Sequence, residues 1–457
     1  MPAPALSPEV VTAAADHAAS WAAFRREQLR VPGVQLAVRL HGRLLHSSAH
    51  GSADLERGTA LTPQHVFRVA SHSKTFTATA VLRLAEQGRL RLDDRLSEHV
   101  PWVVDEDPEL GRATLRELLG HAAGVTRDGL HGDFWQLQED FPGVDGLRAA
   151  VRAGGSLVGR SSRFKYSNVG YSLLGLVVEA VTGTSYAEHV RTALLEPLGL
   201  PRTTPDVPAA GELVTGYSGL ATGPRRPLTS PATAAMAAAA GFCSTAEDLT
   251  AWFAAHARGR TDVLAEHAQR LAQRAEWSTG DGGGGERTYG LGFIGERCGE
   301  RTLTGHSGGF PGHITSSLLD AEAGLAVSVL TNCIDGPAGE LAQGVVKLVD
   351  LFAAEWSQAE PAADLDAFCG RWADLWGVLD VVRAGSALLG LDPAAADPTA
   401  SPVVLEVLDA RHLRVARDGG FGSYAETWEL SRRPDGTPAL RGHSGVTMLP
   451  LDRSARA

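Results

Sequence analysis

Apolar and polar residues alternate along residues 33–51, on both sides of His41-Gly42. A period of two is typical of half-buried strands, and Gly42 allows a tight turn, so this stretch predicts a β-hairpin. The residues before it have helical spacing instead, behind the pair Ser7-Pro8. That order is typical of a helix start, with a capping serine and a proline at the first helical position.

From about residue 90 to residue 285 the pattern is mostly helical, with long loops between the helices. The clearest helices are expected at 169–183 and 245–259, and Gly282–Gly285 predicts a flexible loop. Later strands are expected at 289–296, 301–306 and 312–332, and a last amphipathic helix at 339–356. Two blocks of strands around a helical block predict one sheet built from both ends, with an all-helical region inserted between its strands.

A second, smaller unit is expected at the C-terminal end of the chain. Residues 357–364 are typical of a linker, and short strands with Gly, Asp and Pro turns follow it. These strands predict a small antiparallel β module, with Trp372 and Trp376 in its core. The predicted domains are 1–360, with a helical region at about 75–285, and 364–457.

Composition and charge exclude several classes of protein. Hydrophobic residues make up 44% of the chain and charged ones 21%, which is ordinary for a globular protein. The formal charge of −11, without any Lys/Arg cluster, argues against nucleic acid, because phosphate binding needs a concentrated basic face. No apolar run approaches a membrane span, and the first residues lack the pattern of an export signal, so a cytoplasmic protein is expected.

The cysteines do not predict a metal site. None forms a C-x-x-C pair, and none has a histidine at metal-ligand spacing. Buried free thiols in a reducing compartment are the favoured interpretation, and we expect no metal or cofactor. The four residues are Cys243, Cys298, Cys333 and Cys369.

One candidate nucleophile, Ser307, fits a known sequence pattern, but the residues that follow it do not suit that pattern. Residues 305–309 fit G-x-S-x-G, the nucleophile elbow of α/β-hydrolases, with Ser307 as the attacking group. An elbow needs a helix directly after the turn, but Pro311 and Gly312 follow instead, and strand alternation then resumes. The sequence therefore argues against Ser307 as the nucleophile.

Ser71 is a second candidate nucleophile, and it has a possible base at a suitable spacing. Ser71 and Lys74 fit S-x-x-K at the start of a predicted helix, so Lys74 lies one turn later on the same face. A desolvated lysine with a lowered pKa can take the serine proton, and the helix start places positive potential beside a developing oxyanion. Ser73 is expected only to hydrogen-bond within the first turn. Tyr166 and Asn168, just before another predicted helix, complete the candidate set.

These motifs, in this order, resemble the serine β-lactamase and penicillin-binding-protein superfamily. The likeness is strongest to the branch with class C β-lactamases, family VIII carboxylesterases, D-aminopeptidases and DD-peptidases. It covers about residues 20–357 and is supported by segments such as "ATLRELLGHAAGV", "LLEPLGL" and "AGFCSTAEDL". The resemblance implies an α+β fold, in which helices and an all-helical region flank a β-lactamase-like antiparallel sheet. The C-terminal module resembles the lipocalin-like barrel of some relatives, with packing, shaping of the site entrance and oligomerisation as alternative roles.

The resemblance also implies roles for individual residues. Ser71 would be the acylated nucleophile, Lys74 the neighbouring base and Tyr166 a proton relay. Asn168 would contact Lys74 and the substrate amide. The strand motif of the family would be His306-Ser307-Gly308, lining the substrate, and the backbone N–H groups of Ser71 and Gly309 would form the oxyanion hole.

The residue at 306 departs from the usual pattern of β-lactamases and DD-peptidases, which carry lysine there. Histidine is mostly neutral at pH 7, so His306 gives a substrate carboxylate no permanent charge to pair with. The expected function is therefore a serine hydrolase that acts through a covalent acyl-enzyme on small ester or amide substrates, as a carboxylesterase or as a D-amino-acid-type amidase or peptidase. A β-lactamase or DD-peptidase and a non-catalytic binding module are the alternatives, and a homo-oligomer stays open.

Overall fold

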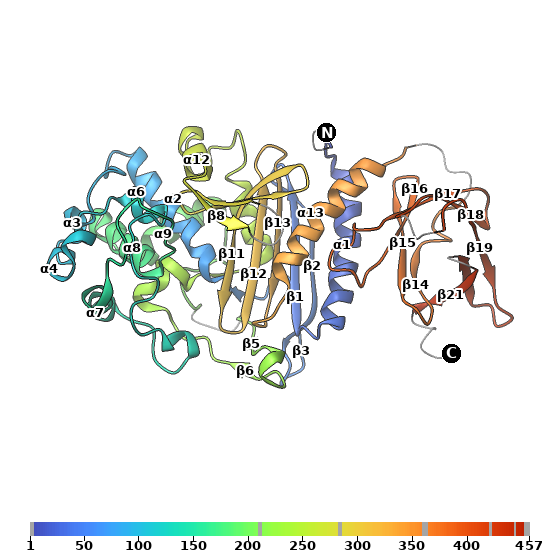
Figure 1. Ribbon diagram of the computed structural model, residues 1–457, viewed down its shortest axis with the longest axis horizontal. Helices are drawn as coiled ribbons and strands as arrows, with labels where there is room; N and C mark the ends of the chain where they lie inside the picture. The colour runs from blue at the N-terminus through green and yellow to red at the C-terminus, as the bar shows by residue number, and fades with distance from the viewer. Residues whose placement is uncertain are drawn as a thin grey trace. The chain divides into compact units, whose positions relative to one another are not determined.

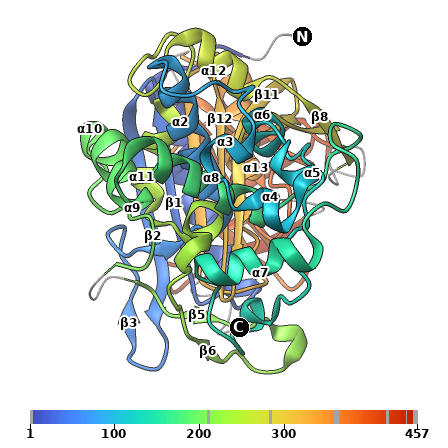
Figure 2. The same ribbon diagram turned by 90° about the vertical axis from the view of Figure 1, so that its left-hand side faces the viewer.

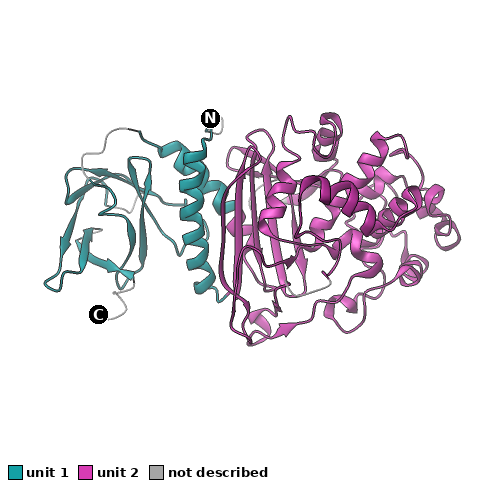
Figure 3. Cartoon of the chain, turned by 180° about the vertical axis from the view of Figure 1, so that it is seen from behind, with its two compact units in different colours: residues 1–30, 343–457 teal, residues 31–342 magenta. Residues whose placement is uncertain are grey.

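The computed structural model describes residues 4–208, 213–281, 286–358, 364–419, 423–442 and 445–451. Within those ranges, no helix has both the length and the apolar character needed to cross a membrane. The chain forms two compact units, one of residues 31–342 and one of residues 1–30 and 343–457 (Figure 3). Each unit has its own sheet and core.

A nine-stranded sheet forms one side of the unit of residues 31–342 (Figure 1). Its order is β3-β2-β1-β13-β12-β11-β10-β9-β8, so strands from both ends of this region meet where β1 pairs antiparallel with β13. This arrangement confirms the sheet predicted from the two blocks of strands. Its strands are β1 (Gly33–Leu40), β2 (Arg43–Asp54), β3 (Thr59–Ala60), β8 (Trp277–Asp281), β9 (Glu286–Tyr289), β10 (Ile294–Cys298), β11 (Arg301–Phe310), β12 (His313–Asp320) and β13 (Leu325–Thr331).

The hairpin of β1 and β2 forms as the alternation predicts. Its turn residues, His41 and Gly42, have φ of 48° and 81°, a left-handed pair that suits the twist of a two-residue hairpin. Two further short strand pairs tie loops together. They are β4 (Phe67–Arg68) with β7 (Cys243–Ser244), and β5 (Gly216–Tyr217) with β6 (Pro227–Leu228).

Helices cover one face of this sheet and extend from it in a thick layer (Figure 2). Helix α11 packs on β1 and β13, α2 packs on α8, and α8 packs on α6 and α7. The α-helices are α2 (Ser73–Glu86), α3 (Leu96–His99), α4 (Val103–Glu106), α5 (Pro108–Gly111), α6 (Leu115–Leu119), α7 (Val144–Gly154), α8 (Asn168–Thr182), α9 (Tyr186–Val190), α10 (Glu196–Leu198), α11 (Ala246–Ala254) and α12 (Glu266–Gln273). Shorter helical turns are η1 (Ala70–His72), η2 (Asp133–Gln136), η3 (Arg191–Leu195), η4 (Leu220–Thr222), η5 (Ala234–Met236) and η6 (Ala237–Gly241), of which η3 and η6 are π-helical.

The other unit contains α1 (Pro8–Gln28), most of α13 (Ala338–Glu355) and a closed eight-stranded antiparallel barrel. Ser7 caps α1, because its side chain accepts a hydrogen bond from the N–H of Val10, and Pro8 is the first helical residue, as predicted. The barrel agrees with a lipocalin-like module. Its strands are β14 (Gly370–Ala373), β15 (Val378–Ala384), β16 (Ala387–Leu391), β17 (Val403–Val407), β18 (His412–Arg417), β19 (Thr427–Arg432), β20 (Pro438–Gly442) and β21 (Val446–Pro450).

One core prediction for the barrel is wrong. Trp372 is buried in a cluster with residues such as Val381 and Trp428, but Trp376 is 91% exposed. It lies in the β14–β15 turn, where Asp374 Oδ1 accepts the N–H groups of Trp376 and Gly377 at 2.7 and 3.0 Å. A side chain in such a turn faces no opposing strand, so the apolar character of Trp376 does not bring it inside.

The predicted domain division at residues 360–364 stays a prediction. Residues 359–363 of the expected linker lie outside the described residues, as does the predicted loop of Gly282–Gly285. Of the cysteines, Cys243, Cys298 and Cys333 are buried, as expected, and Cys369 is half-buried.

Candidate active site

The chain turns sharply just before Ser71. Ala70 is buried and has φ of 47°, a left-handed conformation that costs a non-glycine residue about 1–2 kcal/mol. Ser71 lies in the turn η1, and α2 begins two residues later, which places Lys74 in its first turn. Ser73 donates to the carbonyl of Ala70 and accepts the N–H of Phe242, so it has the local hydrogen-bonding role expected. Tertiary contacts thus hold this turn in a conformation that alanine does not favour by itself.

Tyr166 and Asn168 reach the same place from the start of α8. Ser167 between them caps this helix, because its hydroxyl accepts the N–H of Gly170 at 2.8 Å. His121 Nδ1 accepts the N–H of Ser167 at 3.1 Å, and its ring lies 4.3 Å from the ring of Tyr166. His121 is therefore structural, because it holds the segment that presents Tyr166.

The side chains of Ser71, Lys74 and Tyr166 meet. Tyr166 OH donates to Ser71 Oγ at 2.8 Å, and Lys74 Nζ lies 3.3 Å from the same oxygen. Lys74 also donates to Asn168 Oδ1 at 2.7 Å and to the carbonyl of Ala239 at 2.8 Å. Ser71 and Tyr166 are partly exposed, while Lys74 is completely buried. The amine of Lys74 is thus enclosed by protein, whereas Ser71 and Tyr166 keep part of their surface open to solvent.

Burial makes the charged form of Lys74 costly. It lowers the pKa of Lys74 well below the usual 10.5; the charge of Asp128 raises this pKa and that of Arg127 lowers it further. A neutral amine keeps two N–H bonds, which suit Asn168 Oδ1 and the carbonyl of Ala239, and one lone pair. That lone pair then faces Ser71 Oγ and can accept its proton. Burial also raises the pKa of Tyr166, so its phenol stays protonated.

The strand β11 carries the third motif and is continuous from Arg301 to Phe310. Ser307 therefore lies within a strand that turns directly into β12, with no helix after it, so the structure agrees with the rejection of an elbow. Gly308 faces η1 so closely that an added Cβ would lie 2.1 Å from the carbonyl oxygen of Val69. Only glycine allows this approach, which brings the backbone of β11 beside the start of α2.

His306 is buried, and both of its ring nitrogens have protein partners. Nδ1 lies 2.7 Å from the carbonyl oxygen of Ser307, and Nε2 lies 3.3 Å from the hydroxyl of Tyr289. Burial, followed by the influence of His72 and Lys74, lowers the pKa of His306 well below 6.5, so the ring is neutral. The substrate-binding role predicted for His306, Ser307, Gly308 and Gly309 stays a prediction.

Sequence reasoning missed several residues that contact the candidate site. Asp128 Oδ1 accepts the amide N–H of Asn168 at 2.7 Å and the indole N–H of Trp135 at 3.0 Å. Asp128 and Trp135 lie between α6 and α7, and nothing in the sequence of this segment singles out Asp128. The carbonyl of Ala239, which accepts from Lys74, lies in the π-helical turn η6, for which the sequence gives no clear signal.

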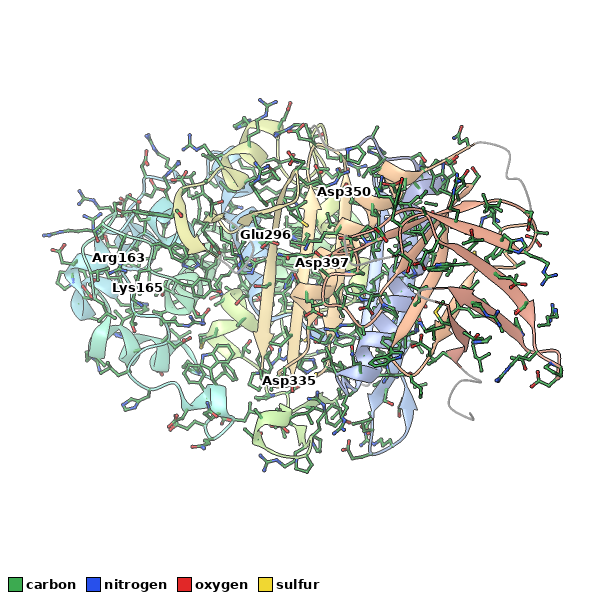
Figure 4. All side chains as sticks on the ribbon, turned by 45° about the vertical axis from the view of Figure 1, so that its right-hand side comes forward. Arg163, Lys165, Glu296, Asp335, Asp350 and Asp397 are labelled. Carbon is green, nitrogen blue, oxygen red and sulfur yellow. The ribbon has the colours of Figure 1, made fainter. Side chains whose placement is uncertain are left out.

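Arg127 carries a positive charge beside this site. The guanidinium of Arg127 lies 5.1 Å from the centre of the Tyr166 ring, and its side chain is 64% exposed. Arg163 and Lys165, on the segment that leads into Tyr166, lie on the helical side of the molecule (Figure 4). Across the described ranges, no group of three or more His, Cys, Asp and Glu side chains could hold a metal ion.

A cavity of about 750 Å³ lies elsewhere in this unit and contains none of the predicted site residues. Its arginines largely have partners, as in the ion pair of Arg258 with Glu322 at 2.7 Å. It is lined by Arg258, Arg270, Gln273, Arg274, Ala275, Thr288, Gly295, Glu296, Arg297, Thr302, Leu303, Thr304, Ala321 and Glu322. With no nucleophile beside a base, this cavity is a poor candidate for the chemistry.

Comparison with known proteins agrees with the fold. The family model described as Beta-lactamase matches residues 18–349. The octameric penicillin-binding protein homologue from Pyrococcus abyssi covers 95% of this chain and 99% of its own at a TM-score of 0.67 and 21% identity. The D-amino acid amidase from Ochrobactrum anthropi SV3, complexed with D-phenylalanine, covers 75% and 98% at a TM-score of 0.63 and 23% identity.

A curated relative is closer in sequence over a shorter stretch. Penicillin-binding protein 4 from Amycolatopsis lactamdurans is 36% identical over 180 residues, which are 38% of this chain and 45% of the relative. The chain thus spans less than half the length of the curated relatives that it matches.

Proposed function

This chain belongs to the Beta-lactamase family, and from that premise we propose that it hydrolyses small esters or amides through a covalent acyl-enzyme. One observation carries the proposal: Ser71 Oγ lies within reach of both Lys74 Nζ and Tyr166 OH, at 3.3 and 2.8 Å. A serine needs a base to become a nucleophile, and these contacts supply one.

Acylation would start when Ser71 Oγ attacks the substrate carbonyl while Lys74 accepts its proton. The new C–O bond turns the carbonyl oxygen into an oxyanion, which the N–H groups of Ser71 and Gly309 would stabilise. The C–N or C–O bond to the leaving group then breaks. Tyr166 would pass a proton to this group and recover one from Lys74. Water would hydrolyse the acyl-enzyme by the same steps in reverse order, which frees Ser71.

Within this class, we favour substrates without a carboxylate next to the scissile bond, such as neutral esters and amino-acid amides. His306, at the position of the family's lysine, is neutral and already bonded at both nitrogens. It therefore offers a carboxylate no charge-assisted hydrogen bond. The likeness to the D-amino acid amidase fits this choice and supports it through the fold alone.

A specific observation favours the alternative, a β-lactamase or DD-peptidase. Arg127 is exposed and lies over the ring of Tyr166 at 5.1 Å, where it could pair with a substrate carboxylate in place of the family's lysine. Hydrolysis of a chromogenic β-lactam that is lost on Arg127→Gln would support this alternative. The cytoplasmic location stays a prediction, and so does a homo-oligomer, which light scattering of the purified protein tests.

The deciding experiment is intact-protein mass spectrometry after exposure to a p-nitrophenyl ester, a β-lactam and a D-amino-acid amide. We expect an acyl adduct with at least one of them on the wild-type protein and no adduct on Ser71→Ala. An adduct that persists in Ser71→Ala would overturn the assignment, and its tryptic peptide would give the true nucleophile. A non-catalytic binding module would show neither adduct nor turnover.

A further inference from the structure

The two ends of the Asn168 amide have opposite partners. Its oxygen accepts from Lys74 Nζ at 2.7 Å, and its nitrogen donates to Asp128 Oδ1 at 2.7 Å. Turning the amide by 180° would place its oxygen against the carboxylate, which is repulsive, and its NH₂ group against the amine, which would lose its acceptor. Asp128 therefore selects the orientation of Asn168 that presents an acceptor to Lys74.

Asp128 is itself fixed in place. The indole N–H of Trp135 donates to the same oxygen at 3.0 Å, and Arg127 Nε lies 3.3 Å from the other carboxylate oxygen. The side chain of Asp128 is only 17% exposed, so water competes little for these contacts. A carboxylate held from two sides is a rigid reference point for the amide beside it.

We propose that Asp128 is a positioning residue, which holds Lys74 against Ser71 through the amide of Asn168. The proposal rests on the proposed function, because it assigns Asp128 to the same acyl transfer. With Asn168 Oδ1 and the carbonyl of Ala239 both fixed, the two N–H bonds of a neutral Lys74 have set directions. The remaining lone pair then faces Ser71 Oγ.

The charge of Asp128 also acts on Lys74, and Arg127 opposes it. The titratable and charged groups around Lys74 are Tyr166, Tyr171, His121, His306, Asp128 and Arg127. Burial raises the pKa of both tyrosines and lowers that of both histidines, so these four stay neutral. Asp128 raises the pKa of Lys74 and Arg127 lowers it. Removing the charge of Asp128 should therefore lower this pKa, and removing that of Arg127 should raise it.

Different substitutions separate the alignment of Lys74 from the effect of nearby charges on its pKa. Asp128→Asn keeps an oxygen for the two N–H donors, Asn168 and Trp135, and loses the charge and the contact with Arg127. Asp128→Ala loses both the charge and the hydrogen bonds. Arg127→Gln removes the opposing charge. Asp140→Asn, at an exposed position of the same loop, and Arg163→Gln, at an exposed position near Tyr166, are the matched controls for lost charge.

The experiment measures kcat/KM against pH for each variant with a neutral p-nitrophenyl ester, which carries no carboxylate for Arg127 to bind. Activity rises with pH as Lys74 loses its proton, so Asp128→Asn should move this acid limb to lower pH and Arg127→Gln to higher pH. The plateau should change by less than about threefold in both. In Asp128→Ala the plateau should fall by up to about 100-fold, because the base is no longer aligned. The two controls should match the wild type.

Three outcomes overturn the proposal: an unchanged plateau in Asp128→Ala, shifts of the same sign in Asp128→Asn and Arg127→Gln, or equal shifts in the controls. If Asp128→Ala fails to fold, the signs in the other two variants decide. Ser71→Ala separates this result from the proposed function. If it keeps the wild-type activity, the acyl-enzyme proposal itself is wrong; if it is inactive while Asp128→Ala is normal, only the positioning role is wrong.

Discussion

The segment around Ser71 and the segment around Ser307 each place a serine in a short hydrolase-like motif, yet the structure treats them differently. Ser71 follows a strained turn and has an amine and a phenol within 3.3 and 2.8 Å of its oxygen. Ser307 is exposed in the middle of β11, where its carbonyl group contacts the ring of His306 at 2.7 Å. The comparison teaches that a serine becomes a candidate nucleophile through its neighbours in space. Its sequence motif alone does not show whether it can act as a nucleophile.

The largest expected effect separates the two serines directly. Ser71→Ala should lower kcat by at least about 1,000-fold, because no other group can form the acyl-enzyme. Ser307→Ala should cost at most about tenfold, the value of one hydrogen bond to a substrate. Steady-state kinetics on one ester substrate measures both. A larger loss of kcat in Ser307→Ala than in Ser71→Ala would contradict this comparison.

Two neighbouring glycines of β11, both next to Ser307 in sequence or nearly so, are expected to differ in how far their substitution lowers the stability of the protein. Gly308→Ala would place a Cβ 2.1 Å from the carbonyl oxygen of Val69, and a backbone atom cannot move aside cheaply. We expect a loss of about 2 kcal/mol in the free energy of unfolding, which is typical of overpacking. In Gly309→Ala the new Cβ would meet only Ile314 Cδ1, at 3.5 Å, an ordinary contact. Denaturant unfolding of both variants checks this difference, and equal losses would contradict it.

The last expected effect concerns pH, and it involves His72, the residue after Ser71. Burial lowers the pKa of His72 to about 4, whereas the unfolded chain titrates near 6.5. The unfolded state therefore binds more protons between these values, and the contribution of His72 to stability is complete above pH 6.5 and is lost as pH falls towards 4. We expect a slope of at most about 1.4 kcal/mol per pH unit from this group.

Urea unfolding at several pH values between 4.5 and 7 measures that slope. His72→Asn should flatten it, while His131→Gln, at an exposed position, should leave it unchanged. His306 shares the direction of the pKa shift, so part of the slope will remain in His72→Asn. A slope unaffected by His72→Asn would contradict the neutral, buried state of this histidine.

Much of the local structure was predictable from the sequence, because each such feature depends on neighbours along the chain. Alternation and Gly42 determined the hairpin of β1 and β2, and Ser7 with Pro8 determined the start of α1. The separation of Ser71 from Lys74 is likewise one helical turn, so the sequence could pair these two residues. The turn of Trp376 shows the limit of this reasoning, because hydrophobic character alone did not give its exposure.

Contacts between distant segments were decided only by tertiary structure. Tyr166 reaches Ser71 from 95 residues away, and the amide of Asn168 meets Asp128 across 40 residues. The sequence placed Tyr166 in the site only through its family resemblance, and it gave no signal for Asp128 or for the carbonyl of Ala239. Periodicity and capping act over a few residues, whereas these contacts depend on how loops and helices pack on the sheet. The sequence thus set the serine and its lysine, and packing set both the groups that align that lysine and the burial that keeps it neutral.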